Sequence, residues 1–357
     1  MKYDPGLDGV RALAISAVVI YHAWSLSVPG GWIGVDIFFV LSGFLITRIM
    51  VFDVEENGGV DFRRFYIRRS LRLLPAFTVL LLFVLGLTFF MPIAERFDNV
   101  RSVGISALYM MNWNRAFAVF PQGMLGHSWT LAAEEQYYLI WPALFIVIRQ
   151  WRPKTILSIL LVIGLSWRLY LVYTGAPSAR TYNGFDTHAD GLLAGCILAF
   201  FLNKSPHVNL GRLANKFILI PIAALIAWSL SVEYDSTLSL TIGFTLGAIL
   251  GIWIIMAVMQ PGALRFVLTS RPVVYTGRIS YGWYLWHYPM LFYGAARLPH
   301  GTWIMFIGSY LAAMASSRLI ERPFLRLKAR FEPDRKTGSL FGERPERRDH
   351  DLAFDEA

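Results

Sequence analysis

Residues 7–44 read LDGVRALAISAVVIYHAWSLSVPGGWIGVDIFFVLSGF, two apolar segments joined by a short turn that contains Pro29 and Gly30. Arg11, His22 and Asp36 lie within otherwise apolar surroundings in these segments. At about 100° per residue, the spacing of Arg11 and His22 puts both on one helix face, roughly 16 Å apart. Ionisable groups in a membrane-length helix are costly and usually line a cavity or a site. A simpler interpretation makes Arg11 an interfacial residue and His22 a packing residue.

The composition indicates a membrane protein. Of the 357 residues, 55% are hydrophobic and only 16% are charged, and the mean hydropathy is +0.48. This profile is typical of polytopic membrane proteins. The single cysteine, Cys196, excludes an intramolecular disulfide. The net charge of +9 does not indicate nucleic-acid binding, because most basic residues lie between apolar segments, where they set topology.

Apolar runs of membrane-spanning length predict an all-α protein with about ten transmembrane helices. Lysine and arginine gather in alternate loops, which predicts that both termini are cytoplasmic. We expect residues 1–325 to form one membrane domain and residues 326–357 to form a disordered, charged cytoplasmic tail. In the long outer segment, residues 92–128, we expect a re-entrant or interfacial helix. The predicted spans are residues 10–27, 33–51, 73–91, 129–148, 155–174, 187–203, 214–232, 237–259, 276–294 and 302–320.

This topology places His22 and Asp36 at a similar depth in the outer half of the membrane. We therefore expect them to form a hydrogen-bonded pair, in which the carboxylate orients the imidazole as a general base. Other polar or aromatic residues at this level predict one hydrated outer cavity that binds substrate. They are Trp129, Glu134, Glu135, Asp190 and His287, with His127, Asp186 and His188 at the same depth. The alternative is that each is a helix-terminal charge, an interfacial anchor or a packing residue.

The inner side carries arginines. Arg69 and Arg72 lie three residues apart at the foot of the third span, and Arg322 lies at the foot of the last span. Since a guanidinium binds phosphate oxygens in a bidentate manner, these residues predict a phosphate-binding mouth below the His/Asp centre. The alternative is that they only set topology. We expect no metal ion.

Seven motifs of the chain resemble those of acyltransferase family 3, the integral-membrane O-acyltransferases that modify bacterial surface glycans and some secondary metabolites. They occur in the family's order between residues 7 and 324. They are LDGVRALAISAVVIYH, GVDIFFVLSGFLIT, RRSLRLLPAF, HSWTLAAEEQYYLIWP, DGLLAG, GRISYGWYLWHYPM and ERPF.

The resemblance implies ten spans in the inner (plasma) membrane, an acyl-CoA donor (usually acetyl-CoA) that enters from the cytoplasm, and a hydroxyl acceptor, commonly a sugar of the cell envelope. It also implies that His22 is the essential histidine, Arg11 its paired arginine, and Arg69 and Arg72 the arginine motif. Some members carry an additional extracytoplasmic hydrolase-like domain, and we expect the stand-alone form here.

Two mechanisms and two rival functions remain open. His22 either removes the proton of the acceptor hydroxyl or is itself acylated and passes the group on. The acceptor could instead be a small-molecule metabolite. A proton-coupled transporter could use the same ionisable residues as a relay, although arginines on one side only and the lack of a clear inverted repeat argue against it.

Overall fold

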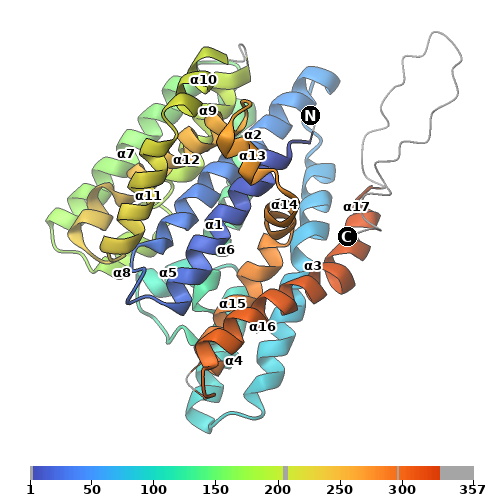
Figure 1. The fold of residues 1–357 in the computed structure, drawn as a ribbon, viewed down its shortest axis with the longest axis vertical. Helices are drawn as coiled ribbons and strands as arrows, with labels where there is room; N and C mark the ends of the chain where they lie inside the picture. Colours follow the sequence, from blue (N-terminus) through green and yellow to red (C-terminus); the bar gives the residue numbers. More distant parts are fainter. Residues whose placement is uncertain (1–2, 204–207, 296, 330–357) are drawn as a thin grey trace, which may run out of the picture.

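The computed structural model describes residues 3–203, 208–295 and 297–329. These residues are mainly helical, and no strand occurs among them. The elements of the first half are α1 (Pro5–Ala23), η1 (Gly31–Ile33), α2 (Gly34–Asn57), α3 (Phe62–Thr88), α4 (Ile93–Ala107), α5 (Met111–Ala116), η2 (Gly123–Ser128), α6 (Trp129–Ile148), α7 (Pro153–Tyr173) and α8 (Ser178–Asn183). The elements of the second half are α9 (Asp190–Asn203), α10 (Val208–Lys216), α11 (Leu219–Ser231), η3 (Ser239–Gly243), α12 (Phe244–Val258), α13 (Ala263–Leu268), α14 (Arg271–Arg278), α15 (Ser280–Gly294), α16 (Gly301–Ser316), η4 (Ser317–Glu321) and α17 (Arg322–Ala329) (Figure 1).

Local sequence signals set the ends of the first helices. The Asp4 side chain accepts a hydrogen bond from the backbone N–H of Gly6, and Pro5 occupies the first turn of α1. Such a cap satisfies a backbone donor that has no partner within the helix. α2 ends at Gly58, whose φ of +74° is the left-handed conformation that glycine adopts without strain. The polar residues around these segments thus separate one apolar helix from the next.

The prediction of an all-α polytopic fold is confirmed. Among the described residues, seven helical segments are long and apolar enough to cross a membrane, or up to eight if the bent pair formed by α10 and α11 is one span. The count of ten is not confirmed, because α9 and α15 are shorter. Two predicted spans are also interrupted: residues 214–232 contain the 54° bend between α10 and α11, and residues 276–294 are divided between α14 and α15. The predicted segment 92–128 forms α4, α5 and η2.

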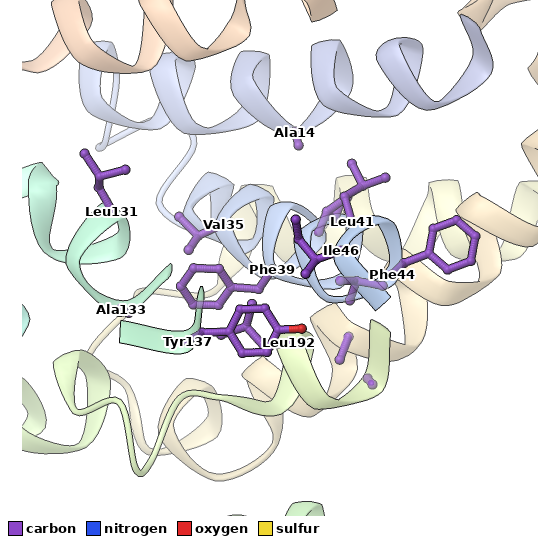
Figure 2. Close-up of a cluster of buried hydrophobic side chains, with 14 of the residues drawn as sticks. Ala14, Val35, Phe39, Leu41, Phe44, Ile46, Leu131, Ala133, Tyr137 and Leu192 are labelled. Atoms are coloured by element: carbon purple, nitrogen blue, oxygen red, sulfur yellow. The ribbon is translucent and has the colours of Figure 1, made fainter. Parts of the chain in front are cut away.

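α2 is the centre of the bundle. Most of its apolar residues are buried, and Figure 2 shows Phe39 and Leu41 of α2 in the core with Ala14 of α1, Leu131 of α6 and Leu192 of α9. A helix that is apolar all round is typical of a buried position.

Glycines bring α2 and α9 into close contact. A Cβ at Gly43 of α2 would lie 2.1 Å from the Leu192 carbonyl oxygen, and one at Gly195 of α9 would lie 2.2 Å from the Val40 carbonyl oxygen. Small residues at such positions let helix backbones approach closely.

The helices around this centre present apolar side chains outward. On α7, Ile159, Val162 and Ile163 are more than half exposed, and only 11% of its most apolar window is buried. Exposed apolar surface of this extent marks a contact with another apolar phase. These faces are therefore suited to lipid, as expected for a multi-pass membrane protein.

The bundle has two ends that matter for the site. α1 runs from one end to the other, with Arg11 in its first half and His22 in its last turn. We call the end near Arg11 the Arg72 end, because Arg11 and Arg72 line one cavity there, and we call the opposite end the His22 end. The predicted tail lies outside the described residues from position 330 onward; residues 326–329 are the last part of α17.

Candidate active site

A cavity of about 300 Å³ lies between α1, α2, α3, α6 and α15. Three of the residues that line it are the predicted arginines Arg11, Arg69 and Arg72. They come from α1 and α3. The sequence analysis grouped Arg69 and Arg72 with Arg322 and paired Arg11 with His22, whereas the structure places Arg11 in one cavity with Arg69 and Arg72.

The three arginines differ in their acidic partners. Arg11 donates to Asp8 at 2.8 Å, and Arg69 lies 3.5 Å from Glu135 with its guanidinium over the ring of Tyr138. Arg72 forms no ion pair within the described ranges of the chain, although its side chain is exposed to the cavity. A guanidinium at membrane depth without a carboxylate partner is costly unless an anion binds to it. The cavity is therefore a candidate anion site.

The far end of this cavity is formed by Thr130 of α6 and Tyr284 of α15. The Tyr284 hydroxyl donates to the carbonyl oxygen of His127, and the Thr130 hydroxyl is hydrogen-bonded to it in turn. Because the Tyr284 proton is engaged by the carbonyl, Thr130 must be the donor in the second bond. The arginine cavity thus ends against the residues that hold His127.

Three histidines meet beyond that end. Nε2 of His287 lies 3.3 Å from Nδ1 of His22, and the His127 ring lies 5.5 Å from the His287 ring, measured between centroids. Tyr288 stacks on His127 at 5.0 Å and contacts His22 edge-on at 5.1 Å. The structure therefore brings together His22, His127 and His287, which the sequence analysis placed at a similar depth.

Backbone carbonyls determine which ring nitrogens of the histidine pair carry protons. Nδ1 of His22 lies 2.9 Å from the Val18 carbonyl oxygen, and Nδ1 of His287 lies 2.7 Å from the Tyr284 carbonyl oxygen. A carbonyl only accepts, so each Nδ1 carries a proton and donates. In the neutral rings Nε2 is then unprotonated, and Nε2 of His287 is a second acceptor for the His22 Nδ1–H. Nε2 of His22 is left with its lone pair, which is the state that a base or nucleophile requires.

The predicted pair of His22 and Asp36 does not form. Oδ1 of Asp36 is hydrogen-bonded instead to Nε2 of His188 at 2.9 Å, and Oδ2 has no hydrogen-bond partner in the part of the chain that the structure describes. Nδ1 of His188 donates to the Tyr182 carbonyl oxygen at 2.7 Å, so the His188–Asp36 pair must hold two protons, one on Nδ1 and one shared between Nε2 and Oδ1. The Asp36 side chain points to His188, which precedes α9, and to Gly247 of α12, and not to His22 of α1. Depth alone could not indicate this rotation about the helix axis.

Two further predicted substrate residues lie near His188 and not near His22. Trp129 packs on His188 with ring centroids 5.4 Å apart. Asp190 forms a buried ion pair with Arg168 at 2.6 Å and accepts a hydrogen bond from Thr245. Asp190 is thus satisfied within the interior, where it connects α7, α9 and α12.

The glutamates also depart from the prediction of a single outer cavity. Glu134 accepts a hydrogen bond from Ser42 at 2.5 Å and lines the arginine cavity, and Glu135 lies beside Arg69. Both glutamates lie farther from the His22 end than predicted, because η2 continues into α6 and the helical segment begins at Gly123 instead of Trp129. Glu134 is thus on the order of 16 Å from the start of that segment. Arg322 begins α17 and is not among the described residues that line the cavity.

Several residues of this arrangement were not predicted as site residues. Ser42, Thr130, Tyr284 and Tyr288 are neutral, and a hydroxyl group in an apolar helix gives no separate signal. The spacing of Tyr284 and Tyr288, four residues apart around His287, was the available sign that one helix face carries all three. Arg168 lies within a predicted span and is fully buried. A charged side chain inside a span usually has a charged or polar partner, so Arg168 indicated a buried acidic residue near it.

The fold and the site together define an all-helical protein with membrane-length helices, an arginine-lined cavity and a histidine cluster beyond it. The family described as "Acyltransferase domain" matches residues 4–322, and the chain belongs to this family. Over 310 residues it is 38% identical to the peptidoglycan O-acetyltransferase OatA of Listeria monocytogenes, with 81% of this chain and 50% of that protein covered. Over 353 residues it is 32% identical to the O-acetyltransferase OatA of Staphylococcus aureus, with 90% and 57% covered. The chain thus spans little more than half the length of these relatives, and no solved structure is significantly similar to it.

Proposed function

We propose that the chain is a membrane O-acyltransferase that moves an acetyl group from acetyl-CoA to a hydroxyl group of a cell-envelope glycan in the inner (plasma) membrane. Family membership and relatives named as O-acetyltransferases support the reaction class, and the name of the Listeria relative supports a glycan acceptor. The observation that carries the choice of donor is the cavity at the Arg72 end. It offers three arginines, and Arg72 has no acidic partner among the described residues.

In this proposal the arginines hold the phosphates of CoA. Guanidinium groups are suited to this, because they donate paired hydrogen bonds to phosphate oxygens. The pantetheine arm then follows the cavity toward Thr130 and Tyr284, which places the thioester near the histidines. Arg11 thereby belongs to the donor site, although the resemblance paired it with His22.

His22 is the proposed general base. Its Nε2 takes the proton of the acceptor hydroxyl while the hydroxyl oxygen attacks the thioester carbonyl. The new C–O bond forms, the C–S bond breaks, and the CoA thiolate takes the proton back from the imidazolium to leave as the thiol. His287 and the Val18 carbonyl hold the imidazole in the required tautomer. In the two-step alternative, Nε2 attacks the thioester first, and the acyl-histidine transfers the group.

The test is transfer of radiolabelled acetyl groups from acetyl-CoA in membranes that contain equal amounts of wild type, His22→Asn or His300→Asn. We expect His22→Asn to lower turnover by about 10²- to 10⁴-fold, the usual contribution of a general base. His300 is the matched control, because it is exposed at the His22 end and its φ of +53° is one that asparagine tolerates. Full activity of His22→Asn would show that His22 is not the base.

A further inference from the structure

A second pocket opens at the His22 end, between the start of α4, the start of η2 with the residues before it, and the end of α15. Its volume is about 610 Å³, and among the described residues none lines both this pocket and the arginine cavity. Tyr288 lines the second pocket and touches the rings of His22 and His127. The Tyr288 ring therefore lies between the pocket and the histidine cluster.

The lining combines an aromatic surface with hydroxyl-binding groups. Tyr288 and Phe292 are stacked with centroids 5.6 Å apart and planes 15° apart, and Phe292 is more than half exposed, so its ring offers an apolar face to the pocket. Such a face packs against the C–H groups of a sugar ring. The carboxylates of Glu95 and Asp98 and the side-chain amide of Gln122 line the same pocket and can bind sugar hydroxyls.

One wall of the pocket is fixed before any ligand binds. Asn99 donates to the Glu95 carbonyl oxygen at 2.8 Å and accepts from the Met124 backbone N–H at 2.8 Å. Gly123 has a φ of +54°, and a Cβ there would lie 2.7 Å from Oδ1 of Asn99. A wall that is already ordered reduces the entropy lost when a ligand binds.

The charge of the pocket selects the kind of ligand. Its lining holds two carboxylates, and each has a guanidinium near it: Arg297 lies 3.4 Å from Glu95, and Arg101 lies 4.0 Å from Asp98. The arginine cavity differs, because Arg72 there has no acidic partner among the described residues. The balanced charges of the second pocket give no net attraction for a phosphate-bearing molecule, whereas its carboxylates can accept hydrogen bonds from the hydroxyl groups of an uncharged sugar.

We infer that this pocket is the acceptor site and that it binds an uncharged sugar residue of the glycan, with one hydroxyl directed past Tyr288 toward His22. The inference rests on the proposed function, since it names the place and the charge class of the acceptor for that reaction. Donor and acceptor then enter from opposite ends of the bundle and meet at the histidines.

The test uses the full chain in lipid nanodiscs, acetyl-CoA, and tetra-N-acetylchitotetraose as an uncharged acceptor. Phe292→Ala should raise the KM for the oligosaccharide by about tenfold through loss of the stacking face, with the KM for acetyl-CoA changed by less than about twofold. The matched control is Phe90→Ala, an exposed phenylalanine that does not line the pocket. An unchanged acceptor KM for Phe292→Ala would overturn the inference, and so would a raised KM for acetyl-CoA alone.

A second comparison tests the charge argument. Wild type should prefer chitotetraose to a tetra-galacturonate acceptor, and Asp98→Asn should reduce that preference by about fivefold, as expected for one charge at short range in water. Asp235→Asn, an exposed carboxylate outside the pocket, should leave the preference unchanged. An equal preference in wild type and Asp98→Asn would overturn the charge assignment. If wild type hydrolyses acetyl-CoA but does not acetylate chitotetraose, the assignment of a sugar acceptor to this pocket is wrong and the proposed function stands. If wild type does not use acetyl-CoA at all, the proposed function itself is wrong.

Discussion

Replacement of Arg72 by alanine tests the donor site most cleanly of the three arginines. Removal of Arg11 or Arg69 would also take away the ion-pair partner of Asp8 or Glu135. The measured change would then combine the loss of donor binding with the effect of the unpaired carboxylate. Arg72 has no acidic partner in the described part of the chain, so its loss acts on the bound anion alone. A hydrogen bond between charged groups contributes about 1.5–3 kcal/mol, which is about a 10- to 150-fold rise in the KM for acetyl-CoA.

The assay compares acetyl-CoA with acetyl-pantetheine, which lacks the CoA phosphates. For wild type, acetyl-pantetheine should have the higher KM, and Arg72→Ala should raise that KM no further because the phosphates are already missing. Arg72→Lys should lie between, since it keeps the charge and loses the paired donors. Arg63→Ala, an exposed residue of α3 outside the cavity, is the matched control. Equal effects of Arg72→Ala on both donors would refute phosphate binding at this position.

Two further predictions concern the packing around α2. Gly43→Ala should lower the midpoint of thermal unfolding in detergent, because its Cβ would meet the Leu192 carbonyl oxygen at 2.1 Å. The control Gly86→Ala should not lower the midpoint, because no atom lies within 4 Å of the added Cβ. Equal midpoints for the two variants would contradict the close contact of α2 and α9. Asp36→Asn should destabilise the protein by about 3–5 kcal/mol, the loss expected when one partner of a buried pair is removed, and leave the KM for acetyl-CoA of the folded protein unchanged. Loss of turnover at unchanged thermal stability would instead indicate that Asp36 acts at the reaction centre.

Hydropathy and residue spacing were sufficient to predict the all-helical membrane fold, because a membrane-length helix needs a long apolar run and little else. They also grouped Arg69 and Arg72, which lie on one helix face, and His22 with His287, which lie at one depth. Depth follows from counting residues along a helix whose start is known.

Contacts between helices were not predictable in the same way. Asp36 was expected against His22 because both lie at the same depth, but it faces His188, since the direction of a side chain around its helix depends on packing. The close approach of α2 and α9 at Gly43 and Gly195 fixes that direction. The depth of Glu134 was missed for another reason, because η2 extends α6 before Trp129.

The central claim is that donor and acceptor reach the histidines from opposite ends of the bundle, and proteoliposomes test it most directly. Acetyl-CoA is supplied on one side of the membrane and chitotetraose only on the other, with both compounds unable to cross the bilayer. We predict acetylated chitotetraose from wild type and a loss of about 10²- to 10⁴-fold with His22→Asn. Product that forms only when both compounds are on the same side would contradict the claim.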